Sequence, residues 1–260
     1  MSQIISFVNQ KGGVGKTTSA VNVASYLADF GKKVLLIDLD PQGNATSGLG
    51  IAKEKLVKNV YDVLCGKVEL KEILYQGLQP TLHIAPASPD LAGAAVELVS
   101  LPDREFLLKK VLTPLKGDYD YVMIDSPPSL GILTVNALTA ADSVVIPVQC
   151  EYYALEGLSQ LLYTIDLVQK NLNPSLNILG VVLTMRDKKT RIANDVVREV
   201  QRNFPGKVFE TIVPRNVRLA EAPSFGQAIL NYEPLCKGAR AYKHLAQEII
   251  SLNNESGIMN

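Results

Sequence analysis

The stretch that decides the fold of this chain covers residues 7–18 and reads Phe7-Val8-Asn9-Gln10-Lys11-Gly12-Gly13-Val14-Gly15-Lys16-Thr17-Thr18. An apolar run before it, residues 4–8, predicts a strand, and residues 19–30 after it predict a helix. The three glycines between them allow the backbone to curl, so that several amide N–H groups point into one concavity at the helix N-terminus. Because free N–H groups and the helix dipole favour an anion there, the stretch predicts a phosphate-binding loop.

Two side chains of this loop match the needs of a nucleotide. Lys16 is placed to reach the β- and γ-phosphates, and the hydroxyl of Thr17 is placed to ligate Mg²⁺. The usual pattern also has a glycine six residues before the lysine, where this chain has Gln10. The alternative is a tight turn between strand and helix, with Lys11 as a solvated surface lysine. Three glycines, a lysine and a threonine at these spacings, directly after a strand, favour nucleotide binding.

The additional lysine before the glycines, Lys11, indicates one family. The sequence from Lys11 to Thr17 resembles the deviant Walker A motif of the ParA/MinD group of ATPases. The resemblance implies that the chain binds ATP with Mg²⁺, and that Lys11 reaches across a homodimer to the nucleotide held by the other subunit. It assigns catalytic roles to Lys11 and Lys16, and nucleotide binding to Lys11, Gly12, Gly13, Val14, Gly15, Lys16, Thr17 and Thr18.

Length and composition predict an ordinary globular protein. The 260 residues are 47% apolar and 20% charged, with a formal net charge of zero, so any nucleic-acid binding must come from a local patch. Cys65, Cys150 and Cys236 lie far apart, which argues against a disulfide framework and against a conventional zinc or iron–sulfur site. There is no signal-peptide pattern, and no apolar run approaches the roughly 18–20 residues that cross a bilayer. We therefore expect a cytoplasmic protein.

Short apolar runs alternate with helical patterns along the chain, as in the predicted helix over residues 155–172. Some runs, such as residues 144–146 and 178–183, are apolar on both faces, as buried parallel strands are. The alternation predicts a doubly wound, mostly parallel α/β sheet with helices on both faces, a P-loop NTPase architecture, in a single domain over residues 1–260. The predicted strands are residues 4–8, 34–38, 82–86, 121–124, 143–148, 178–183 and 208–213.

Two aspartates, Asp38 and Asp40, end and follow the second predicted strand. Ligands of α/β sheets bind beyond the carboxyl ends of the strands, where a carboxylate orients an attacking water or acts on the outer shell of a metal. The segment resembles the Asp-x-Asp-Pro-Gln segment of ParA-type ATPases. That resemblance implies that Asp40 is the catalytic, water-positioning residue and that Asp38 supports the metal site. The alternative makes Asp40 and Pro41 a simple turn and Asp38 a helix cap.

A third carboxylate, Asp125, follows the hydrophobic run 121–124. A rigid strand that ends in an acid is what a Walker B site requires, because it places the carboxylate beside Thr17 and the Mg²⁺ shell. Pro127 and Pro128 end the strand, and the segment resembles the Asp-x-Pro-Pro variant of the ParA/MinD group. The predicted metal site therefore consists of Thr17, Asp38 and Asp125.

The segment from Val213 to Ser224 resembles the chromosomal Soj/ParA branch of this group. Its Pro-Arg-Asn stretch borders the adenine in that branch, which implies that Pro214 and Asn216 contact the base, with Met185 near it. Without the resemblance, a loop before a short helix would be the preferred interpretation.

Basic residues are concentrated between Arg186 and Arg218. This stretch has nine basic and four acidic residues, a local net charge of +5. Such a patch is sufficient for sequence-independent contacts with DNA phosphates, although on charge alone a solvated face is the commoner reading. The resemblance implies that an ATP-bound dimer binds DNA non-specifically, through Arg218 first and through Lys188, Lys189, Arg191, Lys237 and Arg240.

The combined prediction is an ATPase switch for chromosome or plasmid partitioning. Its ATP-bound sandwich dimer holds DNA on the nucleoid, and hydrolysis stimulated by a ParB/Spo0J-like protein releases it. A MinD-like membrane-cycling ATPase is the first alternative, but it would need a basic amphipathic C-terminal helix, and no Lys or Arg follows Lys243. A metabolic ligase or kinase on the same fold is the second, and it should not need Lys11.

Overall fold

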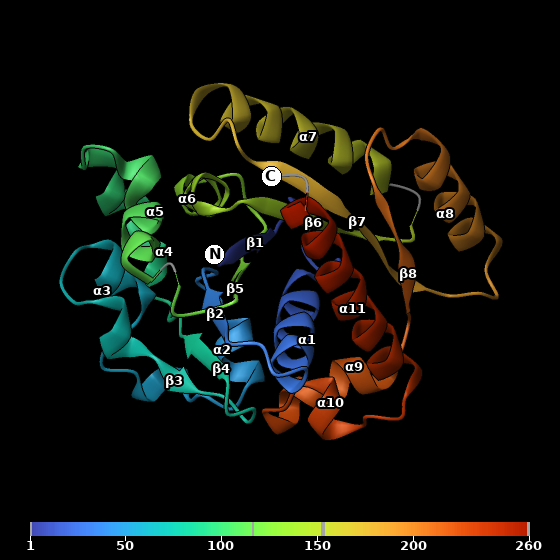
Figure 1. Cartoon of the computed structure of the whole chain (residues 1–260), viewed down its shortest axis with the longest axis horizontal. Coiled ribbons are helices and arrows are strands. Elements are labelled where there is room, and N and C mark those ends of the chain that lie inside the picture. Colours follow the sequence, from blue (N-terminus) through green and yellow to red (C-terminus); the bar gives the residue numbers. More distant parts are fainter. Residues whose placement is uncertain (1, 116, 152–153, 259–260) are drawn as a thin grey trace.

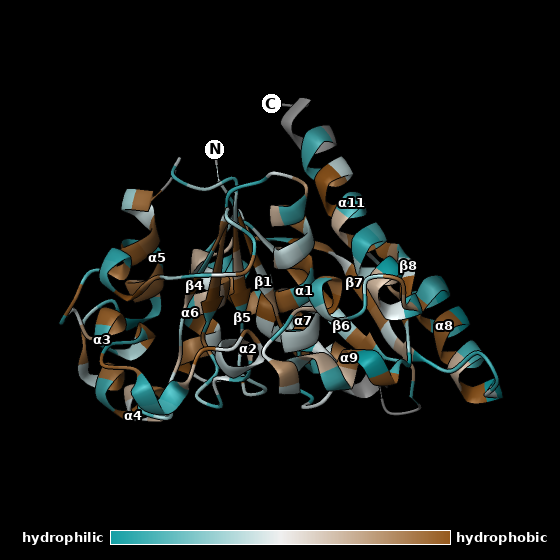
Figure 2. Cartoon of the chain, turned by 90° about the horizontal axis from the view of Figure 1, so that it is seen from below, coloured by the Kyte–Doolittle hydropathy of each residue, from teal (hydrophilic) through white to brown (hydrophobic). Residues whose placement is uncertain are grey.

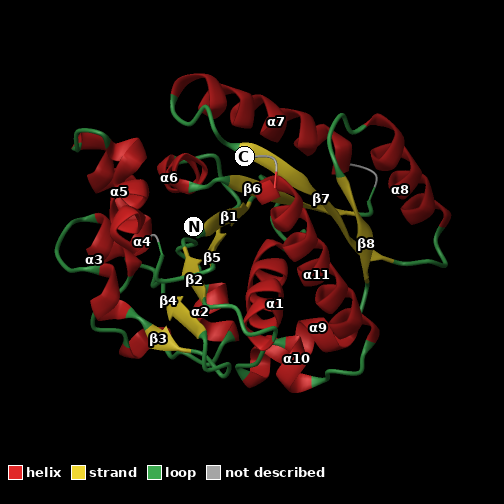
Figure 3. Ribbon diagram, in the orientation of Figure 1, coloured by secondary structure: helices red, strands yellow, loops and turns green. Residues whose placement is uncertain are grey.

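The computed structural model describes residues 2–115, 117–151 and 154–258. In this part of the chain, eight strands form one sheet in the order β3-β4-β2-β5-β1-β6-β7-β8 (Figure 1, Figure 3). All neighbouring strands pair in parallel except β3 and β4, which are antiparallel. The strands are β1 (Gln3–Phe7), β2 (Val34–Asp38), β3 (Tyr75–Gln76), β4 (Leu82–Ala85), β5 (Tyr121–Asp125), β6 (Ser143–Gln149), β7 (Asn177–Arg186) and β8 (Val208–Pro214).

Helices cover both faces of the sheet, because successive strand residues point to opposite sides and both sides are apolar. Ile4 and Leu35 belong to the core under α3 to α8, whereas their neighbours Ile5 and Leu36 belong to the core under α1, α10 and α11. Figure 2 shows the strands and the inner faces of the helices as hydrophobic. The helices are α1 (Lys16–Asp29), α2 (Asn44–Gly48), α3 (Val60–Leu64), α4 (Leu91–Glu97), α5 (Leu107–Leu112), α6 (Ile132–Ala140), α7 (Ala154–Asn171), α8 (Arg191–Asn203), α9 (Val217–Glu221), α10 (Ile229–Tyr232) and α11 (Lys237–Ile258).

Single 3₁₀ turns complete the fold. They are η1 (Lys53–Lys55), η2 (Leu70–Ile73), η3 (Leu98–Ser100), η4 (Arg104–Phe106), η5 (Thr113–Leu115) and η6 (Ala222–Phe225). None of the helices in the described ranges has both the length and the apolar character needed to cross a membrane.

The winding of the sheet reverses at β1. From β1 the chain first builds outward through β2 and β4, returns to β5, and then continues on the other side with β6, β7 and β8. Open α/β sheets bind ligands at such a reversal, outside the carboxyl ends of the strands. The loop after β1 therefore lies where a ligand is expected.

The predicted fold class is confirmed, and all seven predicted strands are present with boundaries shifted by a few residues. The two-residue strand β3 was not predicted. The first helix begins at Lys16 rather than at residue 19, because Gly15 has a left-handed conformation (φ 90°) and the residues after it are already helical. The phosphate-binding loop and the helix N-terminus are thus one continuous feature.

Candidate nucleotide-binding site and basic groove

The loop after β1 is shaped by its glycines and anchored by two neighbouring strands. Gly13 and Gly15 have positive φ angles of 74° and 90°, a conformation that side-chain-bearing residues rarely adopt. Asn9 accepts the amide of Lys11 at 2.9 Å and donates to the carbonyl of Pro147 on β6 at 2.7 Å. The hydroxyl of Thr184 on β7 donates to the carbonyl of Val14 at 2.8 Å. These contacts hold the loop in one shape before any ligand binds.

The loop lysine, Lys16, is almost fully buried, with 6% of its surface exposed. Its Nζ donates to the carbonyl of Lys11 at 3.2 Å, so the ammonium lies over its own loop. Burial lowers the pKa of Lys16, and the negative charges of Asp125 and Asp40 oppose that shift. A buried ammonium that forms charge-assisted hydrogen bonds is a suitable partner for phosphate.

The carboxylate of Asp38 is fully buried and organises the segment that follows it. Its Oδ1 accepts the amide of Asp40 at 3.2 Å, and its Oδ2 accepts both the amide and the hydroxyl of Thr46, at 2.8 and 2.7 Å. Burial raises the pKa of Asp38 to about 6, although the bonds from Thr46 oppose the rise. The hydrogen bonds that Asp38 accepts therefore hold the loop 40–46 in place.

Asp125 is buried in a different way. In the described chain no hydrogen bond of ordinary geometry reaches either of its carboxylate oxygens, although the Thr17 hydroxyl lies close enough to interact with them. Burial and then the charge of Asp38 raise the pKa of Asp125 well above its ordinary value, while the nearby hydroxyl of Thr17 and the ammonium of Lys16 act against the rise. A buried carboxylate without a donor is unfavourable by itself, so this geometry fits a group that receives hydrogen bonds when a ligand is bound.

No group of three or more His, Cys, Asp or Glu side chains in the described residues is arranged to hold a metal ion. A divalent ion at this site would therefore depend on the Thr17 hydroxyl, on phosphate oxygens and on water, with Asp125 beside it. This donor set, made of hard oxygen ligands and few protein groups, fits Mg²⁺, which keeps several waters when it binds with nucleotide phosphates.

A cavity of about 480 Å³ lies over the loop. Its size is within the range of about 300–1,000 Å³ for small-molecule sites. Of the predicted site residues it is lined by Gly12, Gly13, Gly15, Lys16, Thr17, Thr18, Asp40 and Met185. The lining that sequence reasoning missed includes Gln42, Asn44, Ser47, Pro128, Leu219, Pro223 and Gln227.

Met185 stands at the wall of this cavity in a left-handed backbone conformation, with φ 53°. For a residue with a side chain this conformation is uncommon, and such strain is concentrated at ligand sites. The other two residues predicted for the base lie elsewhere. Pro214 lines the basic groove described below, and the side chain of Asn216 caps α9 by accepting the amide of Arg218 at 2.9 Å.

Two predicted residues of the loop, Val14 and Lys11, lie outside the cavity lining. Val14 is buried in the core, with 2% exposed. Lys11 projects outward and forms an ion pair with Glu151 after β6, with 3.5 Å between Nζ and Oε2. The Lys11 side chain is 41% exposed, so it is accessible from outside the subunit.

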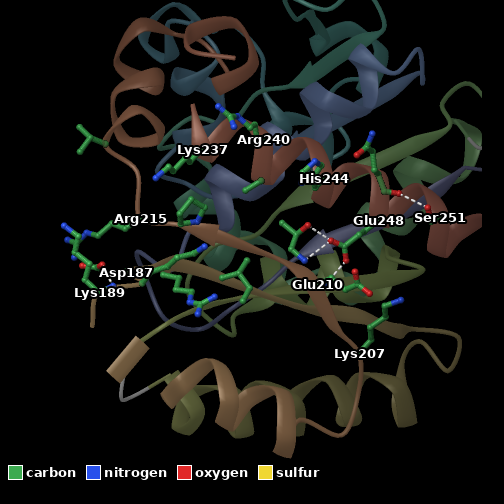
Figure 4. A pocket seen from close by; sticks show the side chains of 18 of the residues that line it. Asp187, Lys189, Lys207, Glu210, Arg215, Lys237, Arg240, His244, Glu248 and Ser251 are labelled. Carbon is green, nitrogen blue, oxygen red and sulfur yellow. Dashed lines mark hydrogen bonds between the residues drawn. The ribbon is translucent and has the colours of Figure 1, made fainter. Parts of the chain in front are cut away.

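A second cavity, of about 1,200 Å³, is an open basic groove between β8, α11 and the end of β7. Its basic residues are Arg186, Lys188, Lys189, Lys207, Arg215, Lys237 and Arg240, and its acidic residues are Asp187, Glu210 and Glu248. In Figure 4, Lys237, Arg215 and Lys189 gather at one end of the groove and Lys207 lies at the other. The carboxylate of Glu248 is hydrogen-bonded to the edge strand β8, where it accepts hydrogen bonds from the amides of Glu210 and Thr211 at 2.9 and 2.8 Å.

Four residues predicted to bind DNA therefore share one groove: Lys188, Lys189, Lys237 and Arg240. Arg191 and Arg218 are not part of its lining. Arg191 pairs with Asp195 at 3.8 Å, and Arg218 pairs with Glu221 at 2.8 Å. Sequence reasoning had not selected Arg186, Lys207 and Arg215 as contact residues, although all three belong to the basic stretch.

Comparison with known proteins indicates the family to which this chain belongs. A family model described as an AAA domain matches residues 2–178. The sporulation initiation inhibitor protein Soj of Bacillus subtilis (strain 168) is 55% identical over 249 residues, which cover 96% of this chain and 98% of that protein. The chromosome partitioning protein ParA of Myxococcus xanthus (strain DK1622) is 53% identical over 250 residues, covering 96% and 88% of the two chains.

Among solved structures, a cobyrinic acid a,c-diamide synthase from Mycobacterium smegmatis, with a bound ATP analogue and magnesium, has a TM-score of 0.86 and 39% identity. The match covers 96% of this chain and 95% of that one. The higher identity to Soj and ParA, over nearly the full length, decides the family. The chain belongs to the Soj/ParA family of chromosome-partitioning ATPases.

Proposed function

We propose that this protein is a nucleotide-switched partition ATPase with a single ATPase domain over residues 1–260. The observation that carries the proposal is the arrangement around the cavity: Lys16, Thr17 and Asp40 line it, and Asp125 lies buried close by. The substrates are ATP and water, the products are ADP and phosphate, and the cofactor is Mg²⁺. A related structure contains an ATP analogue and magnesium, which supports this choice.

The residues of the site have separate roles in binding and hydrolysis. Gly12, Gly13, Gly15 and Thr18 form the rim that receives phosphates, and Lys16 offers its buried ammonium. Mg²⁺ supplies charge neutralisation for the phosphates when it is bound. Thr17 would hold the ion and Asp125 would accept hydrogen bonds from its water, whereas Asp38 acts indirectly, by fixing the loop that carries Asp40. 

Hydrolysis is assigned to Asp40. Asp40 is 6% exposed at the cavity wall, where its carboxylate orients the water whose oxygen attacks the γ-phosphorus. The Oδ1 atom of Asp40 accepts the amide of Gln42 at 2.9 Å, which leaves Oδ2 available for the water. On the base side, Met185 lines the same cavity. Pro214 on β8 and Asn216 before α9 lie outside that lining, so their contact with the base depends on the bound nucleotide reaching beyond it.

Nucleotide binding is linked to DNA through dimerisation. Lys11 exchanges Glu151 for the nucleotide of the partner subunit, so ATP favours the homodimer. The dimer presents the basic groove twice, with Arg191 and Arg218 outside its lining as further contacts, and binds DNA through phosphates without reading sequence. A ParB/Spo0J-like protein accelerates hydrolysis, through a short basic N-terminal segment, and releases the DNA. The protein thus cycles in the cytoplasm between a free form and an ATP-bound, nucleoid-associated form.

The test is DNA binding across a salt series with ATP, with ADP and without nucleotide. We expect binding with ATP alone, a steep salt dependence, and persistent binding by Asp40→Ala, which should retain ATP without hydrolysing it. Lys16→Ala should lose nucleotide binding and DNA binding together. Hydrolysis by Asp40→Ala at the wild-type rate would remove Asp40 from the mechanism, and DNA binding independent of nucleotide would remove the switch.

Two other functions are separated by simple measurements. The likeness to the Mycobacterium smegmatis synthase favours, as a second candidate, a metabolic enzyme that couples ATP hydrolysis to a small-molecule reaction. Turnover of a small carboxylate substrate that is indifferent to DNA and to Lys11→Ala would support it. A MinD-like membrane cycle would instead appear as ATP-dependent sedimentation with anionic liposomes.

A further inference from the structure

The segment that carries Asp40 is a tight turn after β2. The amide of Gly43 donates to the carbonyl of Asp40 at 2.8 Å, and the amide of Gln42 donates to the carboxylate of Asp40 at 2.9 Å. Gly43 has a left-handed conformation, with φ 58° and ψ 39°. The direction of the Asp40 carboxylate is therefore set by the positions of Gln42 and Gly43.

Lys53, from the 3₁₀ turn η1, closes over this turn from outside. Its Nζ donates to the carbonyl of Gln42 at 2.6 Å, a short bond from a charged donor. Its aliphatic stem lies on Gly43, since a Cβ atom there would be 2.5 Å from Cδ and 3.5 Å from Cγ of Lys53. The same Cβ would also be 3.0 Å from the carbonyl oxygen of Ala87. Gly43 is thus packed closely against both the Lys53 side chain and the backbone at Ala87.

The contacts of Lys53 differ from those of a residue that binds nucleotide. The side chain does not line the cavity, whereas Asp40, Gln42 and Asn44 do. The Lys53 ammonium reaches the site only through the Gln42 carbonyl, and Lys53 itself is half-buried. Asp38 fixes the same segment from the side of the sheet, through the amide of Asp40 and through Thr46. The catalytic loop is therefore held from both sides.

We propose that Lys53 is a positioning residue for Asp40. By holding the Gln42 carbonyl and covering Gly43, it keeps the carboxylate of Asp40 directed at the attacking water, without touching ATP. Small displacements of a catalytic group have large effects on rate, because the reacting atoms must be aligned. The inference rests on the proposed function, since it requires Asp40 to act in hydrolysis.

The experiment compares Lys53→Met with Lys53→Arg and with Lys55→Met. Methionine keeps the stem over Gly43 but removes the hydrogen bond, and arginine keeps a charged donor. Lys55 lies in the same 3₁₀ turn and is exposed, so its replacement by Met removes the same charge from the same place. Full-length proteins are assayed for ATP hydrolysis with DNA present, for ATP affinity by titration of a fluorescent ATP analogue, and for thermal unfolding.

We expect Lys53→Met to lower kcat about tenfold, with KM and ATP affinity within about twofold of wild type. Lys53→Arg should recover most of the rate, and Lys55→Met should match wild type. The unfolding midpoints should be similar, which separates a positioning effect from a loss of folded protein. An unchanged kcat in Lys53→Met would overturn the proposal, as would a loss of ATP affinity at constant kcat.

Asp40→Ala, measured alongside, distinguishes this inference from the function on which it rests. If Asp40→Ala is inactive while Lys53→Met is normal, the contacts of Lys53 with Gln42 and Gly43 have no catalytic role and the proposed function stands. If Asp40→Ala hydrolyses ATP like wild type, the proposed catalytic residue is wrong, and the positioning role of Lys53 falls with it.

Discussion

Arg218 and Glu221 lie one turn apart on α9 and are joined by an ion pair, with 2.8 Å between Nη1 and Oε2. The hydroxyl of Tyr232 donates to the same Glu221 oxygen at 3.1 Å. In the absence of DNA, the guanidinium proposed to bind a phosphate is thus held by a carboxylate. Both side chains are exposed to solvent, 53% and 36%, so water and salt weaken the pair and DNA phosphate is able to compete for Arg218.

Arg218→Glu should abolish DNA binding while leaving the ATP-dependent dimer intact. The substitution removes an attraction, adds a repulsion next to Glu221, and acts twice in a dimer. Each phosphate contact contributes about −0.9 to the slope of log affinity against log salt, so the residual binding should depend less steeply on salt. Gel shift and size exclusion, both with ATP, provide the measurement. Retained DNA binding would place the contact elsewhere, and loss of the dimer would make Arg218 an interface residue.

Glu221→Gln should have the opposite effect on the same contact. It removes the competing charge but keeps a side chain of the same size beside Tyr232, so DNA affinity should rise several-fold at low salt and less at high salt. Glu199→Gln is a matched control, because Glu199 is an exposed acid on α8 that lies outside the groove lining. Equal gains in the two variants would mean that only the net charge matters, and that the Arg218–Glu221 pair has no specific role.

Lys11→Ala should separate nucleotide binding from dimerisation. The Lys11 side chain is outside the cavity lining and is accessible beside Glu151, so its loss leaves the phosphate rim complete. ATP affinity should remain near the wild-type value, while the dimer and DNA binding disappear. Titration with a fluorescent ATP analogue and light scattering with ATP measure the two properties. A variant that still dimerises would limit Lys11 to a surface ion pair.

Much of the fold follows from local sequence patterns, because strands buried on both faces must be apolar throughout. The central runs 144–148 of β6 and 180–183 of β7 are of this kind. The strand β3 could not be predicted because two exposed residues are too short for a hydrophobic pattern, and because the strand forms only by pairing with β4. The start of α1 at Lys16 was missed because loop and helix share their residues, and the conformation of Gly15 decides the boundary.

The residues of the candidate site likewise fall into a predictable and an unpredictable group. Asp38 and Asp125 end strands, and Asp40 and the loop 12–18 come shortly after strand ends, so their neighbourhood could be predicted from the strands alone. The wall formed by Leu219 and Pro223 could not, since α9 and η6 reach the cavity only through packing. For example, a Cβ at Gly226 would lie 2.7 Å from the Cα of Gly50, so this contact requires both backbones to approach closely. The groove likewise exists because α11 packs beside β8, which brings Lys237 and Arg240 next to basic residues of the stretch 186–218, and the charge count of that stretch did not show this arrangement.

The buried carboxylates predict an unusual dependence of stability on pH for the protein without nucleotide or metal. Burial raises the pKa of Asp38 to about 6 from an ordinary value of 3.8, and raises that of Asp125 in the same direction. The folded state therefore holds protons that the unfolded chain has already released. This contribution to stability is fully present below the ordinary pKa and is lost as pH rises through the folded pKa, which for Asp38 places the loss between about pH 4 and 6.

Asp125→Asn should isolate this effect. Each pKa unit of upward shift lowers the stability at neutral pH by about 1.4 kcal/mol, and asparagine avoids that loss because it has no proton to release. In EDTA at pH 7 the variant should melt at a higher temperature than wild type, with the difference shrinking as the pH falls toward 4. With ATP and Mg²⁺ the order should reverse, since the oxygens of Asp125 then gain the hydrogen bonds that they lack in the free protein. Thermal unfolding across pH, with and without nucleotide and Mg²⁺, measures both parts. A variant that melts lower than wild type in EDTA at pH 7 would show that Asp125 stabilises the free fold, and that its oxygens are not held in reserve for a ligand.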